Sequence, residues 1–231
     1  MKKFIALALV IVALVLSFTS CSIKDAIKVN PYDLSNFPDS YEIAYKIVLV
    51  SKDGEKNVNV VTSGCDAKGN FAYLGTSPET LYLAKGEDSY DKYSSMLLSD
   101  TFKLEETDQN RTSAASTSFR YANYAYDEVK DGATYEKIDS LTLPDDIKSK
   151  DLVFLDTEKF EYYAVTGGRK EQGRTFQTAI EKKTGKCFYV HYDGGLNSSG
   201  AYCDEYYFYV ETYTTPYNED YSSKLQSRLP D

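Results

Sequence analysis

The sequence predicts a mainly β protein of the α+β class, folded as a single domain. Its 231 residues include 22 tyrosines and no tryptophan, and tyrosine, valine, isoleucine and threonine favour strands. From Tyr41 to Leu49, apolar side chains alternate with the others at a period of two, which is typical of a half-buried strand. Short turns then separate the apolar runs that follow, a spacing that predicts an antiparallel meander.

The segment that precedes this domain has the layout of an export signal. Two lysines are followed by an apolar run from Phe4 to Leu16, which fits a signal peptide and is shorter than the roughly 20 residues of a membrane-spanning helix. The next residues, Phe18-Thr19-Ser20-Cys21, resemble a bacterial lipobox. That resemblance implies removal of residues 1–20 and attachment of a lipid anchor, with palmitate-like acyl chains, to Cys21. The alternative is an ordinary secretory signal that is cut near Ser20.

These features predict three segments in the chain: a signal peptide over 1–20, a lipidated cysteine and tether over 21–40, and one β domain over 41–231. We expect the mature protein to be held by its lipid on the extracytoplasmic side of a membrane in the bacterial cell envelope. The formal net charge is -9, and loss of the signal peptide removes two lysines and makes it more negative. Such an acidic chain disfavours nucleic acid as a partner. Side chains in the tether that can dock on a domain are Tyr32, Leu34 and Phe37.

The order of the remaining elements follows from apolar periodicity and from turn residues. Glycine and proline punctuate the chain at the expected turns. The segment from Ser89 to Leu98 fits helix and strand equally well, and 107–118 lacks apolar anchors and is expected to be a mobile loop. Interior helices are expected over 119–129 and 145–150, and a terminal helix over 218–229. Strands are expected over 41–49, 58–62, 71–74, 80–85, 160–165, 175–181, 186–192 and 202–213.

Three cysteines remain once Cys21 is assigned to lipid. If the last hairpin is symmetric about Gly195, Cys187 lies opposite Cys203, and the two thiols are close enough to form a disulfide that leaves Cys65 free. The alternative is a pair of buried, reduced thiols. The sequence contains no Cys-x-x-Cys and only one histidine, so we expect neither a metal site nor a cofactor.

The tyrosine-rich strands, the stretch GRTFQTAIEKKTGKCFYVHYDG and the final strand YYFYVETYTT together resemble the LolA-like outer-membrane lipoprotein carrier superfold. The resemblance covers roughly Tyr41 to Thr215. It implies an open, strongly curved antiparallel sheet, a half-barrel, whose concave face holds acyl chains under a few helices. The helices expected over 119–129 and 145–150 would be that cover. The function implied is non-enzymatic binding of a lipid, a lipidated peptide or another hydrophobic ligand.

Two other hypotheses start from individual residues. The first starts from the short motifs of serine penicillin-binding enzymes, which this chain reproduces in order. They are Ser89 with Lys92, Tyr121 with Asn123, and Lys183-Thr184-Gly185, and they would make Ser89 the nucleophile. Short motifs of common residues also arise by chance, and we expect His191 to be a surface residue rather than a base. The second hypothesis is a module that binds a protein or glycan of the envelope through exposed tyrosines. These tyrosines include Tyr202, Tyr206, Tyr207 and Tyr209.

Overall fold

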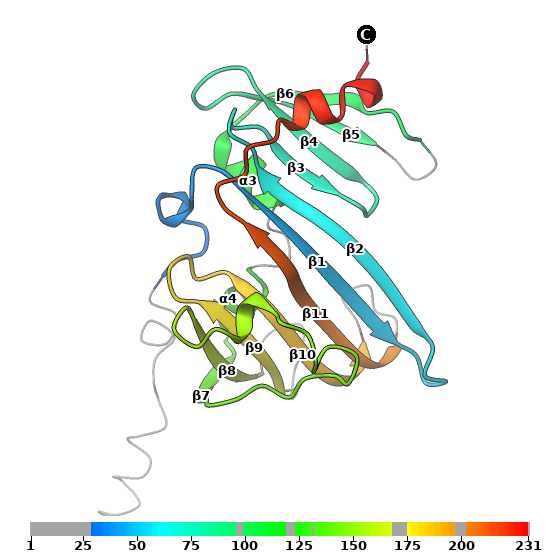
Figure 1. Cartoon of the computed structure of the whole chain (residues 1–231), viewed down its shortest axis with the longest axis vertical. Coiled ribbons are helices and arrows are strands. Elements are labelled where there is room, and N and C mark those ends of the chain that lie inside the picture. Colours follow the sequence, from blue (N-terminus) through cyan, green and yellow to red (C-terminus); the bar gives the residue numbers. More distant parts are fainter. Residues whose placement is uncertain are drawn as a thin grey trace, which may run out of the picture.

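All the strands that the structure describes belong to one open antiparallel sheet. Its eleven strands follow the order β6-β5-β4-β3-β2-β1-β11-β10-β9-β8-β7, and the sheet curves strongly along its length (Figure 1). The predicted fold class, mainly β with a single curved antiparallel sheet and a few short helices, is confirmed. The computed structural model describes residues 29–95, 99–118, 123–130, 132–167, 175–196 and 202–230.

The topology is two meanders joined at the centre of the sheet. Neighbouring strands are consecutive in the chain except for the pair of β1 and β11, which brings the first and last strands together. The strands are β1 (Tyr41–Val50), β2 (Lys56–Cys65), β3 (Phe71–Leu74), β4 (Glu79–Ala84), β5 (Tyr90–Ser95), β6 (Lys103–Gln109), β7 (Thr134–Ile138), β8 (Phe160–Thr166), β9 (Thr175–Glu181), β10 (Cys187–Leu196) and β11 (Tyr202–Thr214).

Helices are short and few. They are α3 (Arg111–Ser118), α4 (Tyr124–Lys130) and α5 (Tyr221–Lys224), with 3-10 turns η1 (Leu34–Asn36), η2 (Val153–Leu155) and η3 (Gln226–Arg228). The terminal helix expected over 218–229 is therefore present as α5 followed by η3. Within the interior helix expected over 119–129, α4 is observed, and residues 119–122 lie outside the described residues.

The expectation of a mobile loop over 107–118 is wrong. The chain there completes edge strand β6 and then forms α3, whose first turn is capped by Asn110: Ser113 donates its backbone N–H to Asn110 Oδ1 at 2.8 Å. Strand β6 is exposed along most of its length, so its sequence has no buried face to create alternation. Residues Tyr90–Ser95 form strand β5, which settles that part of the ambiguous segment as strand.

The helix expected over 145–150 is also absent. The segment forms hydrogen-bonded turns instead, in which Ile147 and Lys148 donate to the carbonyl of Pro144 at 3.0 and 3.1 Å. A stretch of six residues is too short to hold a helix without strong packing. Its side chains contact the outer face of the sheet instead, where the Tyr207 hydroxyl bonds Asp146.

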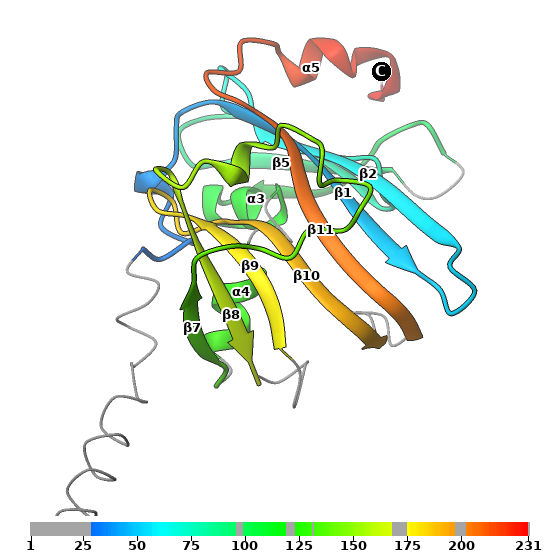
Figure 2. The same cartoon turned by 60° about the horizontal axis from the view of Figure 1, so that its bottom comes forward.

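Both faces of the curved sheet are covered. Helices α3 and α4 lie inside the curve, whereas the long connection 139–159 and the C-terminal segment with α5 lie outside it (Figure 2). Outside, Phe154 stacks on Tyr189 with ring centroids 5.0 Å apart, and Tyr221 packs in a separate cluster with Leu81 and Phe102. The central strands are therefore buried on two sides, which explains why β11 is apolar or aromatic at every position from Tyr206 to Val210.

The strand register does not place Cys187 opposite Cys203. Leu196 pairs with Tyr202, and Cys203 lies opposite Gly195, so the hairpin turns several residues later than a loop centred on Gly195. Eight residue steps along the strand separate Cys187 from Gly195, a distance of roughly 26 Å. Cys187 is a buried free thiol, and the expected disulfide is corrected to a reduced cysteine at this position.

Candidate functional site

The concave face of the sheet is a broad apolar surface at the centre of the molecule. The register places Ile47 of β1 opposite Phe208 of β11, and Phe208 opposite Val190 of β10. All three are at most 6% exposed. Beside them the Tyr45 and Phe208 rings meet edge to face at 5.2 Å. This face combines aromatic and branched aliphatic side chains over both halves of the sheet.

Ser63 is a polar side chain on this face that has no partner within the described part of the chain. It belongs to β2, lies between Ile43 and Tyr73 in the register and is 1% exposed. Its hydroxyl makes no hydrogen bond to the described residues. A buried hydroxyl without a partner costs about 1 to 3 kcal/mol, so most buried polar groups are hydrogen-bonded and an exception such as this one needs an explanation.

Helices α3 and α4 cover this face with small side chains. Of their described side chains, those that are fully buried are Ala114 and Ala115 on α3, with Ala125 and Val129 on α4. The backbone N–H of Ala125 donates to Cys187 Sγ, and that sulfur lies 2.9 Å from Thr178 Oγ1. Helices of seven or eight residues are marginal by themselves, and each buried methyl group contributes only about 0.8 kcal/mol. The fully buried contacts described for this cover are therefore made mostly by small side chains.

A buried lysine lies at the end of this cover. Lys186 follows the tight turn before β10 and is 2% exposed. Its ammonium group is 4.8 Å from the ring centroid of Phe37 and 5.9 Å from that of Tyr32, and it donates to Asn123 Oδ1 at 2.7 Å. The ring faces attract the cation, but desolvation is the larger effect and lowers the pKa of Lys186 to about 7.

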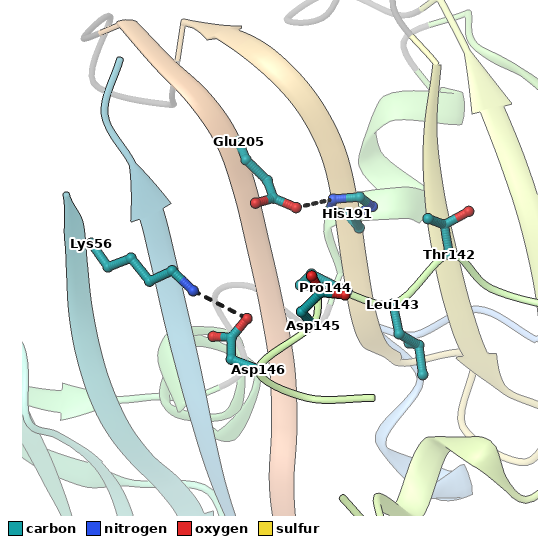
Figure 3. Close-up of a pocket in the computed structure, with 8 residues that line it drawn as sticks. All are labelled: Lys56, Thr142, Leu143, Pro144, Asp145, Asp146, His191 and Glu205. Atoms are coloured by element: carbon teal, nitrogen blue, oxygen red, sulfur yellow. Dashed lines mark hydrogen bonds and ion pairs between the residues drawn. The ribbon is translucent and has the colours of Figure 1, made fainter. Parts of the chain in front are cut away.

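A second candidate site is a polar pocket on the outer face of the sheet, with a volume of about 300 Å³ (Figure 3). His191 of β10 forms its floor and is 6% exposed, and its Nε2 lies 2.8 Å from Glu205 Oε1. Lys56 and Asp146 form an ion pair of 3.2 Å across the opening. The wall is the segment 142–146.

Side chains of the sheet hold this wall in place. The backbone N–H of Thr142 donates to Gln177 Oε1 at 2.5 Å, and its carbonyl accepts from the Tyr189 hydroxyl at 2.7 Å. Farther along, the Tyr207 hydroxyl donates to Asp146. This bond and the Lys56 ion pair lower the pKa of the Asp146 carboxyl in spite of desolvation, which is the largest single effect and acts in the opposite direction.

Two pairs of basic and acidic side chains line the pocket, Lys56 with Asp146 and His191 with Glu205. His191 is oriented by Glu205, as a general base would be, but the lining that the structure describes includes neither serine nor cysteine. The interpretation of His191 as a surface residue is wrong, because connection 139–159 covers it. Its partner Glu205 could not be found from the sequence, since the two are diagonal neighbours whose pairing depends on the register.

The tyrosine platform expected on β11 is also corrected. Tyr206, Tyr207 and Tyr209 are at most 6% exposed. Tyr206 stacks on Tyr192, and the other two are hydrogen-bonded to connection 139–159. For Tyr202 only the backbone is described. The first three therefore act as core residues, and Tyr207 also donates to Asp146 in the wall of the outer pocket.

The residues of the acyl-enzyme hypothesis do not assemble. Ser89 directly precedes strand β5, and Ser89 Oγ lies 3.1 Å from Asp108 Oδ1. Lys92 pairs instead with Glu105 and Glu106 at 3.1 and 3.0 Å. Tyr121 lies outside the described residues, and Lys183-Thr184-Gly185 forms the turn between β9 and β10, with Gly185 at φ +69°.

Some expectations concern residues that the structure does not describe. Cys21 and the whole signal segment lie outside the described residues. Within the described ranges, no helix combines the length and apolar character needed to cross a membrane. Across the same ranges, histidine, cysteine and acidic side chains form no group of three that could bind a metal ion.

Comparison with known proteins gives a distant likeness in fold. No family model matches the chain, and no curated protein matches it. Among solved structures, the chain is similar to a LolA superfamily protein from Nitrosomonas europaea, with 11% sequence identity, a TM-score of 0.29, and coverage of 89% of this chain and 97% of the other. At this TM-score the likeness carries no functional argument, so function has to be inferred from the residues of this chain.

Proposed function

We propose that this chain is a non-enzymatic binding protein that holds a lipid or another hydrophobic ligand against the concave face of its sheet. In this proposal a lipid on Cys21 tethers the protein to a membrane on the extracytoplasmic side of a bacterial envelope. The ligand lies between the sheet and the short helices α3 and α4. The site is thus an extended apolar surface with a polar contact at Ser63.

The observation that carries the proposal is the buried, unpaired hydroxyl of Ser63 on an aromatic and aliphatic face of the described sheet. An ester, hydroxyl or carboxyl group of an amphiphilic ligand would satisfy this hydroxyl, while its acyl chain replaces the small side chains of the helices. Burial of each methylene contributes about 0.8 kcal/mol. An acyl chain of about ten or more carbons would therefore exceed what the four fully buried side chains described for the helices contribute.

A fluorescent fatty acid, 11-dansylundecanoic acid, tests this proposal. We expect saturable binding with a blue shift in emission, because the dansyl group leaves water. In the Ile47→Asn variant a polar side chain replaces a residue of the concave face, and binding should fall at least tenfold. The matched control is Val58→Asn, on the neighbouring strand, where the side chain is 49% exposed and binding should be unchanged.

Each variant is checked first by its melting temperature, so that loss of binding is separated from unfolding. A second measurement uses the wild-type protein extracted from membranes: native mass spectrometry should find a non-covalent lipid. Saturation that is equal in the wild type and in both variants, together with the absence of any co-purified lipid, would refute the proposed ligand.

The anchor is tested separately. A Cys21→Ser variant should lose incorporation of radiolabelled palmitate and leave the membrane fraction. Retention of label in that variant would exclude Cys21 as the lipidated residue without affecting the ligand proposal.

A further inference from the structure

The N-terminal segment 29–40 docks on the domain rather than hanging free as a spacer. In Figure 1 it is the blue stretch beside the turn between β9 and β10. Leu34 and Phe37 pack against the core. The backbone carbonyl of Val29 approaches the turn so closely that a Cβ atom on Gly185 would overlap with it. The turn thus requires glycine both for its positive φ and for this contact.

Tyr32 connects this segment to helix α4. Its hydroxyl donates to the carboxylate of Asp127, with oxygen distances of 2.7 and 2.9 Å. Its ring meets that of Tyr126 edge to face at 5.9 Å. Desolvation and the Asp127 carboxylate raise the pKa of Tyr32 to about 12, so the hydroxyl remains a donor at any physiological pH.

Lys186 also connects the same segment to the start of α4. The ammonium group lies against the rings of Phe37 and Tyr32 and donates to Asn123, the residue before the helix. Tyr32 of the segment therefore contacts α4 itself, and Phe37 contacts Lys186, which bonds the residue before that helix. The described buried side chains of α4 itself are only Ala125, Val129 and the preceding Asn123.

We propose that segment 29–40 is a latch that holds α4 over the concave face, so that undocking of the segment releases this part of the cover. The proposal rests on the proposed function in so far as the cover encloses a ligand. If Cys21 carries the lipid, eight residue steps separate the anchor from Val29, which reach at most roughly 28 Å. A pull on the anchor would then act directly on the latch.

Hydrogen exchange of the α4 amides tests the latch without any ligand. The Tyr32→Phe variant keeps the ring and removes the hydroxyl that bonds Asp127, and Lys186→Met removes the ammonium group. We expect exchange of the α4 amides to accelerate about fivefold or more in each variant, since a hydrogen bond to a charged group is lost. Amides of β1 and β11 should not change.

The matched control is Tyr217→Phe, which removes a hydroxyl that donates to Glu219 at 3.0 Å on the other side of the sheet. That change should leave α4 exchange as in the wild type. Unchanged α4 exchange in both Tyr32→Phe and Lys186→Met would overturn the latch. Uptake of 11-dansylundecanoic acid is measured in parallel: faster exchange without any uptake supports the latch and refutes the ligand.

Discussion

The Oδ2 atom of Asp66 accepts a hydrogen bond from the backbone N–H of Tyr221 at 2.8 Å, so the turn after β2 holds the start of helix α5. Asp66 is fully buried, and its carboxylate also accepts from the backbone N–H groups of Lys68 and Asn70 at 2.9 Å. One side chain thus fixes a tight turn and attaches the C-terminal segment to the outer face.

Replacement of Asp66 by alanine should be strongly destabilising. It leaves several buried N–H groups without an acceptor, each at a cost of about 1 to 3 kcal/mol, so we expect the free energy of unfolding to fall by about 3 to 5 kcal/mol. Urea denaturation measures this loss, and limited proteolysis should cut the C-terminal segment first. Asp53→Ala, in the exposed turn between β1 and β2, is the control and should change stability by less than about 0.5 kcal/mol. A loss below about 1 kcal/mol for Asp66→Ala would contradict this role.

Stability should rise with pH because of Lys186. Burial lowers its folded-state pKa from 10.5 to about 7, so between these values the unfolded chain binds the additional proton. The free energy of unfolding therefore increases as pH rises from about 7 toward 10. Below pH 7 the lysine is charged in both states and its contribution is constant.

The measurement is urea denaturation at pH 7, 8 and 9, compared between the wild type and Lys186→Met. The wild type should gain up to a few kcal/mol over this range relative to the variant. Lys183→Met changes an exposed lysine in the same turn and should keep the wild-type slope. Parallel profiles for the wild type and Lys186→Met would show that Lys186 titrates normally.

Removal of the Ser63 hydroxyl should raise the stability of the protein and lower its affinity for the fatty acid. In Ser63→Ala a methyl group replaces an unpaired buried hydroxyl, so we expect the protein to become more stable by about 1 kcal/mol. Affinity for the fluorescent fatty acid should fall at the same time, because the polar contact to the ligand is lost. A functional residue that costs stability behaves in this way.

The control for this prediction is another buried serine. The Ser94 hydroxyl is hydrogen-bonded to Glu105, so Ser94→Ala should destabilise the protein and leave fatty acid affinity unchanged. If Ser63→Ala is destabilising as well, its hydroxyl has a structural partner, and the argument for a ligand contact fails.

The sequence was sufficient to predict strands that have one face more deeply buried than the other. Strand β1 alternates because its inner face is buried deeply and parts of its outer face are not, and the turns at Gly54, Gly69 and Gly185 all have positive φ. Strand β11 misled the prediction of an exposed tyrosine surface, since a strand covered on both sides carries no alternation. Strand β6 was missed for the opposite reason, because it is exposed on both sides.

The candidate sites were less predictable than the fold. Nothing in the sequence distinguishes Ser63 from other serines, and its significance depends on which neighbours bury it. Likewise the pairing of His191 with Glu205 depends on a hairpin register that a glycine-rich loop leaves undetermined. Tyr32 and Phe37 were identified as docking side chains, but their target, Lys186, becomes buried only when the N-terminal segment folds back on the sheet.

Cys65 and Cys187 should be unreactive in the native protein. Burial raises their thiol pKa to about 12 and about 11, respectively, so almost no thiolate is present at pH 8. Iodoacetamide at pH 8 should leave both cysteines unmodified until urea unfolds the chain, as followed by peptide mass spectrometry. A disulfide-linked peptide pair that joins Cys187 to Cys203, found by mass spectrometry without reduction, would contradict the register.

Ser89 should not form an acyl-enzyme. In a Ser-x-x-Lys site both side chains must share one face, as they do at helical spacing, whereas residues three apart in a strand point to opposite faces. Hydrogen bonding to Glu106 raises the pKa of Lys92, which keeps the amine protonated and unable to act as a base. We therefore expect a fluorescent penicillin to leave the protein unlabelled and Ser89→Ala to bind fatty acid as the wild type does. Covalent label that appears in the wild type and disappears in Ser89→Ala would restore the enzyme hypothesis.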